Sequence, residues 1–238
     1  AAPNTFFFSL AIRRLNDWVP QVRQAAREKL PQIASTTKPE FVVEALSTAL
    51  ANWNSWGRIE DVDTKVLLEI ISKDEIAQTL VAKLISSPSG PMPSLFSQLG
   101  RTSILDDHLE EIAARAIQPS VRAKAYRSLF EGRIVWMEGR KWIWTDIRYC
   151  EGRLEAAVSE RKLNVDTPCL DLLKTSSADT SSIVRRVSAE FLIRNLDELG
   201  IHAKGFAEGF ASDKSNPVSE RGYFALKKLG ETKNANAS

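Results

Sequence analysis

The residues with the clearest capacity for chemistry form two clusters of tryptophans and charged side chains. The first contains Trp53, Trp56, Glu60, Asp61 and Asp63. On a continuous helix, residues four apart share a face, which places the Trp56 ring beside the Glu60 carboxylate. An aromatic ring next to a carboxylate can hold a cationic group. The structural alternative is that the tryptophans pack and the carboxylates stabilise the first turn of an acidic helix.

The second cluster lies between residues 133 and 149 and contains three of the six tryptophans of the chain. Basic groups among aromatic rings can neutralise phosphates and stack on bases. The same residue types form the hot spots of protein–protein interfaces. A third interpretation is that the rings fill a gap between imperfectly stacked helices, with cations over their faces. The candidate partner-binding residues are Arg133, Trp136, Arg140, Lys141, Trp142, Trp144 and Arg148.

The motifs of the common enzymatic mechanisms are absent from the sequence. It contains no phosphate-binding glycine loop, no zinc-protease motif and no nucleophile elbow. Cys150 and Cys169 lack partners at zinc-ligand spacing, and we expect both to be reduced thiols of a cytoplasmic protein. We therefore expect no metal, no cofactor and no catalytic set.

The elements that must position these clusters include a repeated helix. In four windows a Val is followed after four residues by a small residue, and after four more by Leu. This spacing marks one face of a helix, with a notch where another helix can approach closely. The windows are Val22-Ala26-Leu30, Val121-Ala125-Leu129, Val184-Ser188-Leu192 and Val218-Gly222-Leu226.

The residues in front of these helices repeat as well. Three windows have an Asp five residues before the Val, which can accept hydrogen bonds from free backbone N–H groups of the turn. Three have a Pro near the first turn, where a missing N–H costs nothing. An Arg follows the Val in three windows, either as an anion site or as a partner for the Asp of a neighbouring repeat. These residues are Asp17, Asp179 and Asp213; Pro20, Pro119 and Pro217; and Arg23, Arg122 and Arg185.

The segment Asp17-Trp18-Val19-Pro20-Gln21-Val22-Arg23 resembles the HEAT repeat family. The resemblance implies an all-α fold, an α-solenoid of antiparallel helix pairs. A weaker resemblance, carried by Trp56 with Glu60 and by residues 179–189, points to the HEAT-fold DNA alkylpurine glycosylases, where such a pair would hold a cationic nucleotide. The chain departs from that family because Glu60 replaces an expected Asp.

We predict further helices at residues 5–16, 39–51, 62–72, 74–86, 104–117, 152–163, 168–175 and 203–211. Near 133–145 the sequence favours a short β-hairpin that turns at Glu138-Gly139-Arg140, although a helix broken at Gly139 is an alternative. Residues 1–229 are expected to form a single domain and 230–238 a flexible tail. The chain starts at Ala1 instead of Met, and we expect that it has either been processed or been cut from a longer protein.

Composition and charge complete the prediction. The chain has 238 residues, 43% of them apolar, and a net charge of +2, and no apolar run is long enough to cross a membrane. Residues 59–111 carry ten acidic and four basic side chains, whereas 121–186 carry thirteen basic and nine acidic. We predict a non-catalytic scaffold that binds a protein partner through a concave helical surface and the Trp/Arg-rich insertion. The alternative is a nucleic-acid-binding protein, including a glycosylase-like repair enzyme with Trp56 and Glu60 in its site.

Overall fold

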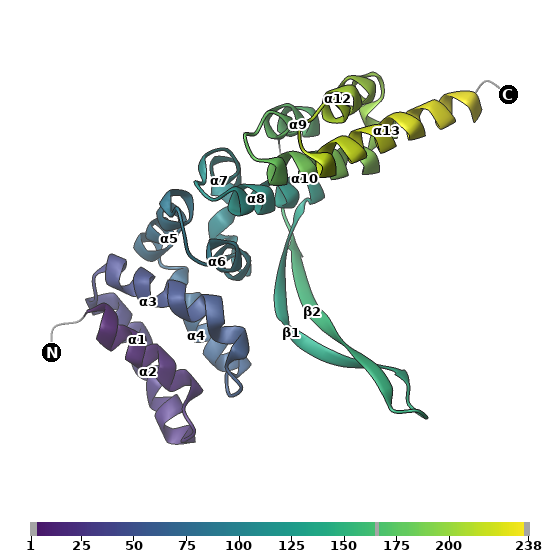
Figure 1. The fold of residues 1–238 in the computed structure, drawn as a ribbon. Coiled ribbons are helices and arrows are strands. Elements are labelled where there is room, and N and C mark those ends of the chain that lie inside the picture. Colours follow the sequence, from purple (N-terminus) through teal and green to yellow (C-terminus); the bar gives the residue numbers. More distant parts are fainter. Residues whose placement is uncertain (1–3, 165–166, 236–238) are drawn as a thin grey trace. The chain divides into compact units, whose positions relative to one another are not determined.

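The computed structural model describes residues 4–164 and 167–235, with only the backbone described for 232–235. These residues form helices and one antiparallel β-hairpin, as expected for a mostly all-α protein with a hairpin insertion (Figure 1). The chain divides into two compact units. Unit 1 comprises residues 1–108 and 133–162, and unit 2 comprises 109–132 and 163–238.

Unit 1 is organised around α3, whose Leu46 and Leu50 are fully buried. This helix packs against α1, α5 and α6, while α2 packs against α4. The elements are α1 (Thr5–Arg13), η1 (Arg14–Asn16), α2 (Pro20–Thr36), α3 (Pro39–Asn52), η2 (Trp53–Ser55), α4 (Asp61–Ile71), α5 (Asp74–Ser86), α6 (Met92–Leu99), η3 (Ser103–His108), β1 (Arg133–Asp146) and β2 (Glu151–Lys162).

Unit 2 is organised around α10, whose Val184 and Leu192 are fully buried. This helix packs against α8, which precedes it in the sequence, and against α13, which follows it. Helix α12 packs along α13. Three of the four repeated windows therefore lie on helices that contact one another in sequence order. The elements are α7 (Leu109–Arg115), α8 (Pro119–Glu131), α9 (Cys169–Ser177), α10 (Ser182–Arg194), α11 (Leu196–Leu199), α12 (Ile201–Ala211) and α13 (Asn216–Ala235).

The turn aspartates act as predicted. Asp17 accepts a hydrogen bond from the backbone N–H of Val19 at 3.0 Å. Asp179 and Asp213 accept from the N–H groups two residues later in the same way, at 2.7 and 2.8 Å. The prolines also fall where expected, because α2 and α8 begin at a Pro and α13 has one as its second residue. These prolines and aspartates are helix-start signals.

The repeated arginines pair with the Asp of the next window in unit 2. Arg122 donates two hydrogen bonds of 2.8 Å to the Asp179 carboxylate, and Arg185 donates two of 2.6 and 2.9 Å to Asp213. Each guanidinium also donates to the carbonyl six residues before it. The structural interpretation of these arginines is therefore confirmed. Arg23 keeps the carbonyl contact but pairs with Glu60 instead.

The notch is tightest at Gly222 in α13. A Cβ atom there would lie 2.1 Å from the backbone nitrogen of Ala211, so α12 approaches the glycine backbone directly. Ala125 and Ser188 occupy the same position in α8 and α10 and are fully buried. Ala26 in α2 is only half-buried, so the notch there is partly open.

The structure corrects two predictions of local structure. Residues 152–163, predicted as a helix, form β2 and the residue after it. The hairpin therefore spans 133–162, and its turn lies between Asp146 and Glu151 instead of at Glu138-Gly139-Arg140. Helix α6, which starts at Met92 between Pro91 and Pro93, was not among the predicted helices. Helix α13 continues to Ala235, into the segment predicted as a tail, and residues 236–238 lie outside the described chain.

Candidate interaction surface

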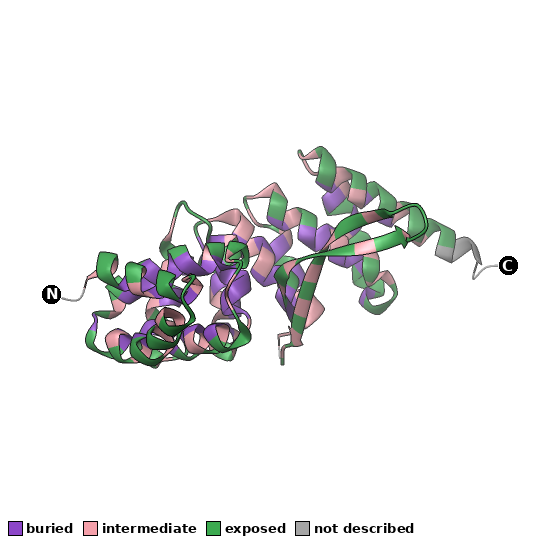
Figure 2. Ribbon diagram, turned by 90° about the horizontal axis from the view of Figure 1, so that it is seen from below, coloured by how far each residue is buried: buried purple, intermediate pink, exposed green. Residues whose placement is uncertain are grey.

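The hairpin is the part of unit 1 that is least covered by other elements. Strands β1 and β2 pair antiparallel, from Arg133 opposite Lys162 to Asp146 opposite Glu151. Only the base of the hairpin packs on α6 and η2, and the arm extends beyond them (Figure 1). Most of its length is exposed or half-buried (Figure 2).

A close backbone approach fixes the base of the hairpin. Ile134 is fully buried and lies over Gly100, where a Cβ atom would meet the Ile134 Cγ2 atom at 2.2 Å. From the opposite strand, Arg161 donates to the Gly100 carbonyl at 2.7 Å and pairs with the Asp106 carboxylate. One apolar and one ionic contact thus attach the two strands to the segment that follows α6.

Arg101 lies between two tryptophan rings and provides a second attachment. Its guanidinium carbon is 4.9 Å from the centroid of Trp53 and 5.6 Å from that of Trp136. The same guanidinium pairs with Glu138 at 2.9 Å, and Glu138 accepts a 2.6 Å hydrogen bond from the Trp136 indole N–H. Burial lowers the pKa of Arg101, and the Glu138 carboxylate partly offsets this effect.

A β-bulge determines which side chains share a face of the arm. The pairing shifts by one residue between Met137 and Gly139, which leaves Glu138 as the extra residue. Side chains alternate between the two faces along a strand. The extra residue in β1 therefore brings the odd-numbered positions of β1 before the bulge and its even-numbered positions after the bulge onto the same face. This face, called the exposed face, carries Val135, Met137, Trp142, Trp144, Leu154 and Val158.

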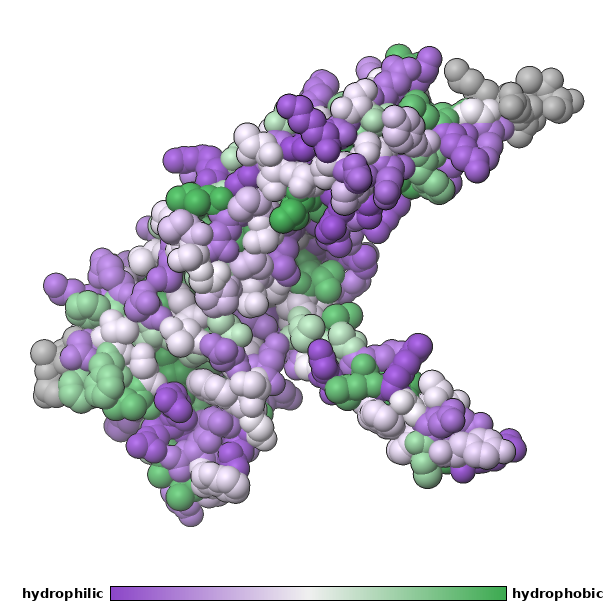
Figure 3. All heavy atoms as spheres, in the orientation of Figure 1, coloured by the Kyte–Doolittle hydropathy of each residue, from purple (hydrophilic) through white to green (hydrophobic). Residues whose placement is uncertain are grey.

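The exposed face is apolar although it points to solvent. Its six large apolar side chains have exposed fractions between 37% and 61%. Trp142 and Trp144 lie edge to face with ring centroids 5.6 Å apart, and Gly152 leaves the space that the Trp142 ring fills. In Figure 3 the arm shows hydrophobic surface between charged groups.

The charges of the exposed face are mainly positive. Arg140 and Lys162 point to this side according to the register, together with the ion pair between Arg133 and Glu160 at 2.7 Å. Near the tip, Arg148 lies in a turn between Ile147 and Tyr149, whose side chains are more than 70% exposed. An apolar surface with Arg140 at its middle and basic residues at its two ends is therefore available to a partner.

The structure separates the predicted binding residues into two groups. Trp136 lies on the face directed toward Arg101, in agreement with the interpretation of packing rings with a cation between them. According to the strand register, Lys141 also lies on the face opposite to the exposed face. The residues on the exposed face or at the tip are Arg133, Arg140, Trp142, Trp144 and Arg148. Sequence reasoning missed Val135 and Met137, because the bulge is needed to bring them onto the face of Trp142 and Trp144, and it missed Leu154 and Val158, because 152–163 was predicted as a helix.

The carboxylates of the first tryptophan cluster connect the start of α4 to α2 through ion pairs. Glu60 precedes α4 and pairs with Arg23 at 3.2 Å and with Arg27 at 2.9 Å. Arg27 also pairs with the fully buried Asp63 at 2.7 Å. Trp56 follows the short helix η2 and is half-buried, and residues 56–60 are not helical, so the continuous helix predicted to place Trp56 beside Glu60 is not present. Both carboxylates are thus engaged by arginines of α2.

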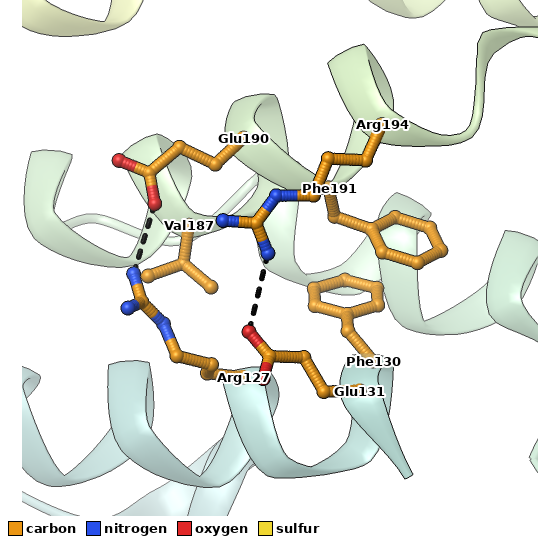
Figure 4. Close-up of a pocket in the computed structure, with 7 residues that line it drawn as sticks. All are labelled: Arg127, Phe130, Glu131, Val187, Glu190, Phe191 and Arg194. Atoms are coloured by element: carbon orange, nitrogen blue, oxygen red, sulfur yellow. Dashed lines mark hydrogen bonds and ion pairs between the residues drawn. The ribbon is translucent and has the colours of Figure 1, made fainter.

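A shallow pocket lies between α8 and α10 in unit 2 (Figure 4). Phe130 and Phe191 stack in it with ring centroids 4.1 Å apart. Two ion pairs between the helices flank the rings, one from Arg127 to Glu190 and one from Arg194 to Glu131.

Residues 4–164 and 167–235 contain no group of three or more His, Cys, Asp or Glu side chains that could hold a metal ion. Cys150 and Cys169 are free thiols and exposed. Within the same ranges, no helix has the length and apolar character needed to span a membrane. No family model matches the chain, and no curated protein is significantly similar to it.

Proposed function

We propose that this protein is a non-catalytic interaction module that binds a protein partner through the exposed face of its hairpin. The observation that carries the proposal is the row of six large apolar side chains on that face. Burying the exposed part of these side chains stabilises a complex by about 25 cal/mol for each Å² of apolar surface removed from water. Contiguous exposed apolar patches of soluble proteins mark interaction sites.

The composition of the exposed face favours a protein over a nucleic acid. Four of its six apolar side chains are aliphatic, and aliphatic groups neither stack on bases nor neutralise phosphates. Trp142 and Trp144 have the size and rigidity of interface anchors. Arg140 and Lys162 lie on the same face, so the matching partner segment combines apolar side chains with carboxylates.

The helices provide the scaffold in this proposal. We attribute the repeated windows to HEAT-like repeats, supported by the turn aspartates and by the Arg122–Asp179 and Arg185–Asp213 pairs. The ion pairs of Glu60 support a structural role for the Trp56 and Glu60 cluster, because a carboxylate held by two arginines is less available to a substrate cation. This favours the scaffold over the glycosylase alternative.

Photo-crosslinking from two neighbouring positions tests the proposal. A photoreactive phenylalanine analogue replaces Leu154 on the exposed face or Glu155 on the other face, in cells that contain the native partners. We expect a discrete protein adduct from position 154 and none from position 155. An Arg140→Glu change combined with the probe at 154 should abolish the adduct, because it reverses the charge that the partner's carboxylates meet.

Two outcomes would overturn the proposal. One is equal crosslinking from both positions, which would indicate unspecific contact. The other is an adduct at 154 that contains nucleic acid instead of protein, which would favour the nucleic-acid alternative for the hairpin.

A further inference from the structure

Basic residues of unit 2 are concentrated on three of its helices, and acidic residues predominate in the rest of the unit. Helices α8, α10 and α13 carry ten Lys and Arg residues and four Asp and Glu residues. The rest of the sequence of unit 2 carries four basic and nine acidic residues. Since α10 packs between α8 and α13, the three basic helices are neighbours.

The surface charges of these helices are not balanced by their ion pairs. Glu190 of α10 alone is contacted by three guanidinium groups, those of Arg127 at 2.9 Å, Arg221 at 3.0 Å and Arg186 at 3.6 Å. Each of these arginines comes from α8, α10 or α13 and is at least 32% exposed. Burial, together with the charge of Arg127, lowers the pKa of Lys124 on α8. One carboxylate thus lies among three cations within reach of solvent.

An aromatic ring follows this cluster by about one turn along α13, because Phe224 is three residues after Arg221 on the same side of the helix. Counted six residues from the repeated Val, Phe224 of α13 is equivalent to Glu190 of α10 and Arg127 of α8. The Phe224 side chain is 48% exposed, and the Lys228 ammonium lies 5.3 Å from the ring centroid. An exposed ring beside cations can stack on a base while the cations contact phosphates.

We propose that the face formed by α8, α10 and α13, called the basic face, binds the phosphate backbone of a nucleic acid. The cations are not confined to the cluster around Glu190, because Lys228 follows Arg221 by seven residues, about 10 Å along α13, so they form a row. A row of cations matches a chain of phosphates better than one isolated phosphate group. Phe224 favours a nucleic acid over a phosphorylated or acidic peptide. The basic face and the exposed face of the hairpin share no residue, so this proposal is independent of the proposed function.

Fluorescence anisotropy with a labelled single-stranded oligothymidine tests the basic face. The double variant Arg186→Gln/Arg221→Gln should bind more weakly, and the slope of log affinity against log salt should fall by about 0.7 for each lost phosphate contact. Glu190→Gln should instead bind about two- to fivefold more tightly at low salt, because it removes the negative charge that competes for the three arginines.

Matched controls separate this site from other basic surfaces. Lys204→Gln on α12 removes an exposed cation outside the basic face and should leave affinity unchanged. Arg140→Gln on the hairpin should also leave it unchanged. Melting curves verify that the variants are folded, and the two arginine changes provide a second readout if Glu190→Gln lowers stability. Equal affinity of the arginine double variant and the unmodified protein, or weaker binding by a folded Glu190→Gln variant, would overturn the proposal.

Discussion

At Asp213, the carboxylate accepts hydrogen bonds from the Arg185 guanidinium at 2.6 and 2.9 Å and from the Ser215 backbone N–H. The bonds from Arg185 are the main reason why the pKa of Asp213 lies below its ordinary value of 3.8. Asp179 occupies the same place one window earlier, and the hydrogen bonds from Arg122 lower its pKa although burial opposes them. The ionised form of both residues is therefore favoured in the folded protein.

This pairing predicts a pH dependence of stability with a definite sign. Because the pKa of Asp213 is lowered on folding, its contribution is complete well above 3.8 and is lost as the pH falls through the folded pKa. Asp213→Asn should reduce the free energy of unfolding at pH 7 by about 2 kcal/mol and flatten its decline below pH 4. Urea unfolding at several pH values measures both. The same pH profile in Asp213→Asn and the unmodified protein would contradict the assignment, and Asp171→Asn, at an exposed pair with Lys174, is the matched control.

At the scale of elements, the packing of α12 on α13 depends on a missing side chain. Gly222→Ala introduces a Cβ atom 2.1 Å from a backbone nitrogen, so the helices must move apart. We expect a loss of about 1 to 3 kcal/mol in the free energy of unfolding. Gly209→Ala, in α12, meets nothing within 4 Å and should stabilise the protein by about 0.4 to 1 kcal/mol. Thermal melts of the two variants that shift in the same direction would contradict this packing.

A second prediction at this scale concerns the attachment of the hairpin to η2 and to the segment after α6. Arg101→Ala removes the cation between Trp53 and Trp136 and leaves Glu138 without its ion pair. Hydrogen exchange at the base of the hairpin should become faster by about tenfold or more, corresponding to roughly 1.5 kcal/mol, while the helices remain protected. Arg153→Ala, which removes only an exposed pair with Glu155, should have no such effect. Unchanged protection in Arg101→Ala would show that Ile134 and Arg161 alone attach the hairpin.

How much the sequence predicts differs between helices and strands. Helix starts carry local signals, so α3 and α5 were placed within a residue of their ends. Strand β2 carries Glu155-Ala156-Ala157, which favours a helix locally, and only pairing with β1 makes it a strand. Gly139 was interpreted as a turn because a glycine between two β-rich runs is typical of one, whereas it adjoins a bulge. Register depends on the partner strand, and the apolar row on the exposed face could therefore not be predicted.

At the scale of the whole molecule, one inserted hairpin supplies the main candidate surface. It lies between α8 and α9 in the sequence but belongs to unit 1 through its packed base. Its bulge places the large apolar side chains together on the exposed face, which is opposite to the face that packs on the helices. The arm thus exposes a face that a folded protein would ordinarily bury, and a partner is the simplest element to cover it.

The most direct test uses the partner protein identified by crosslinking. It measures the affinity of this partner for two double variants, which are changed on opposite faces of the arm. Trp142→Ser/Trp144→Ser removes the aromatic anchors of the exposed face, and Lys141→Ser/Arg153→Ser shortens two exposed side chains of the other face. We predict that the tryptophan variant binds about 1,000-fold more weakly at an unchanged melting temperature, since two interface anchors contribute about 2 kcal/mol each. The other variant should bind normally. Equal affinities of the two variants would contradict the account.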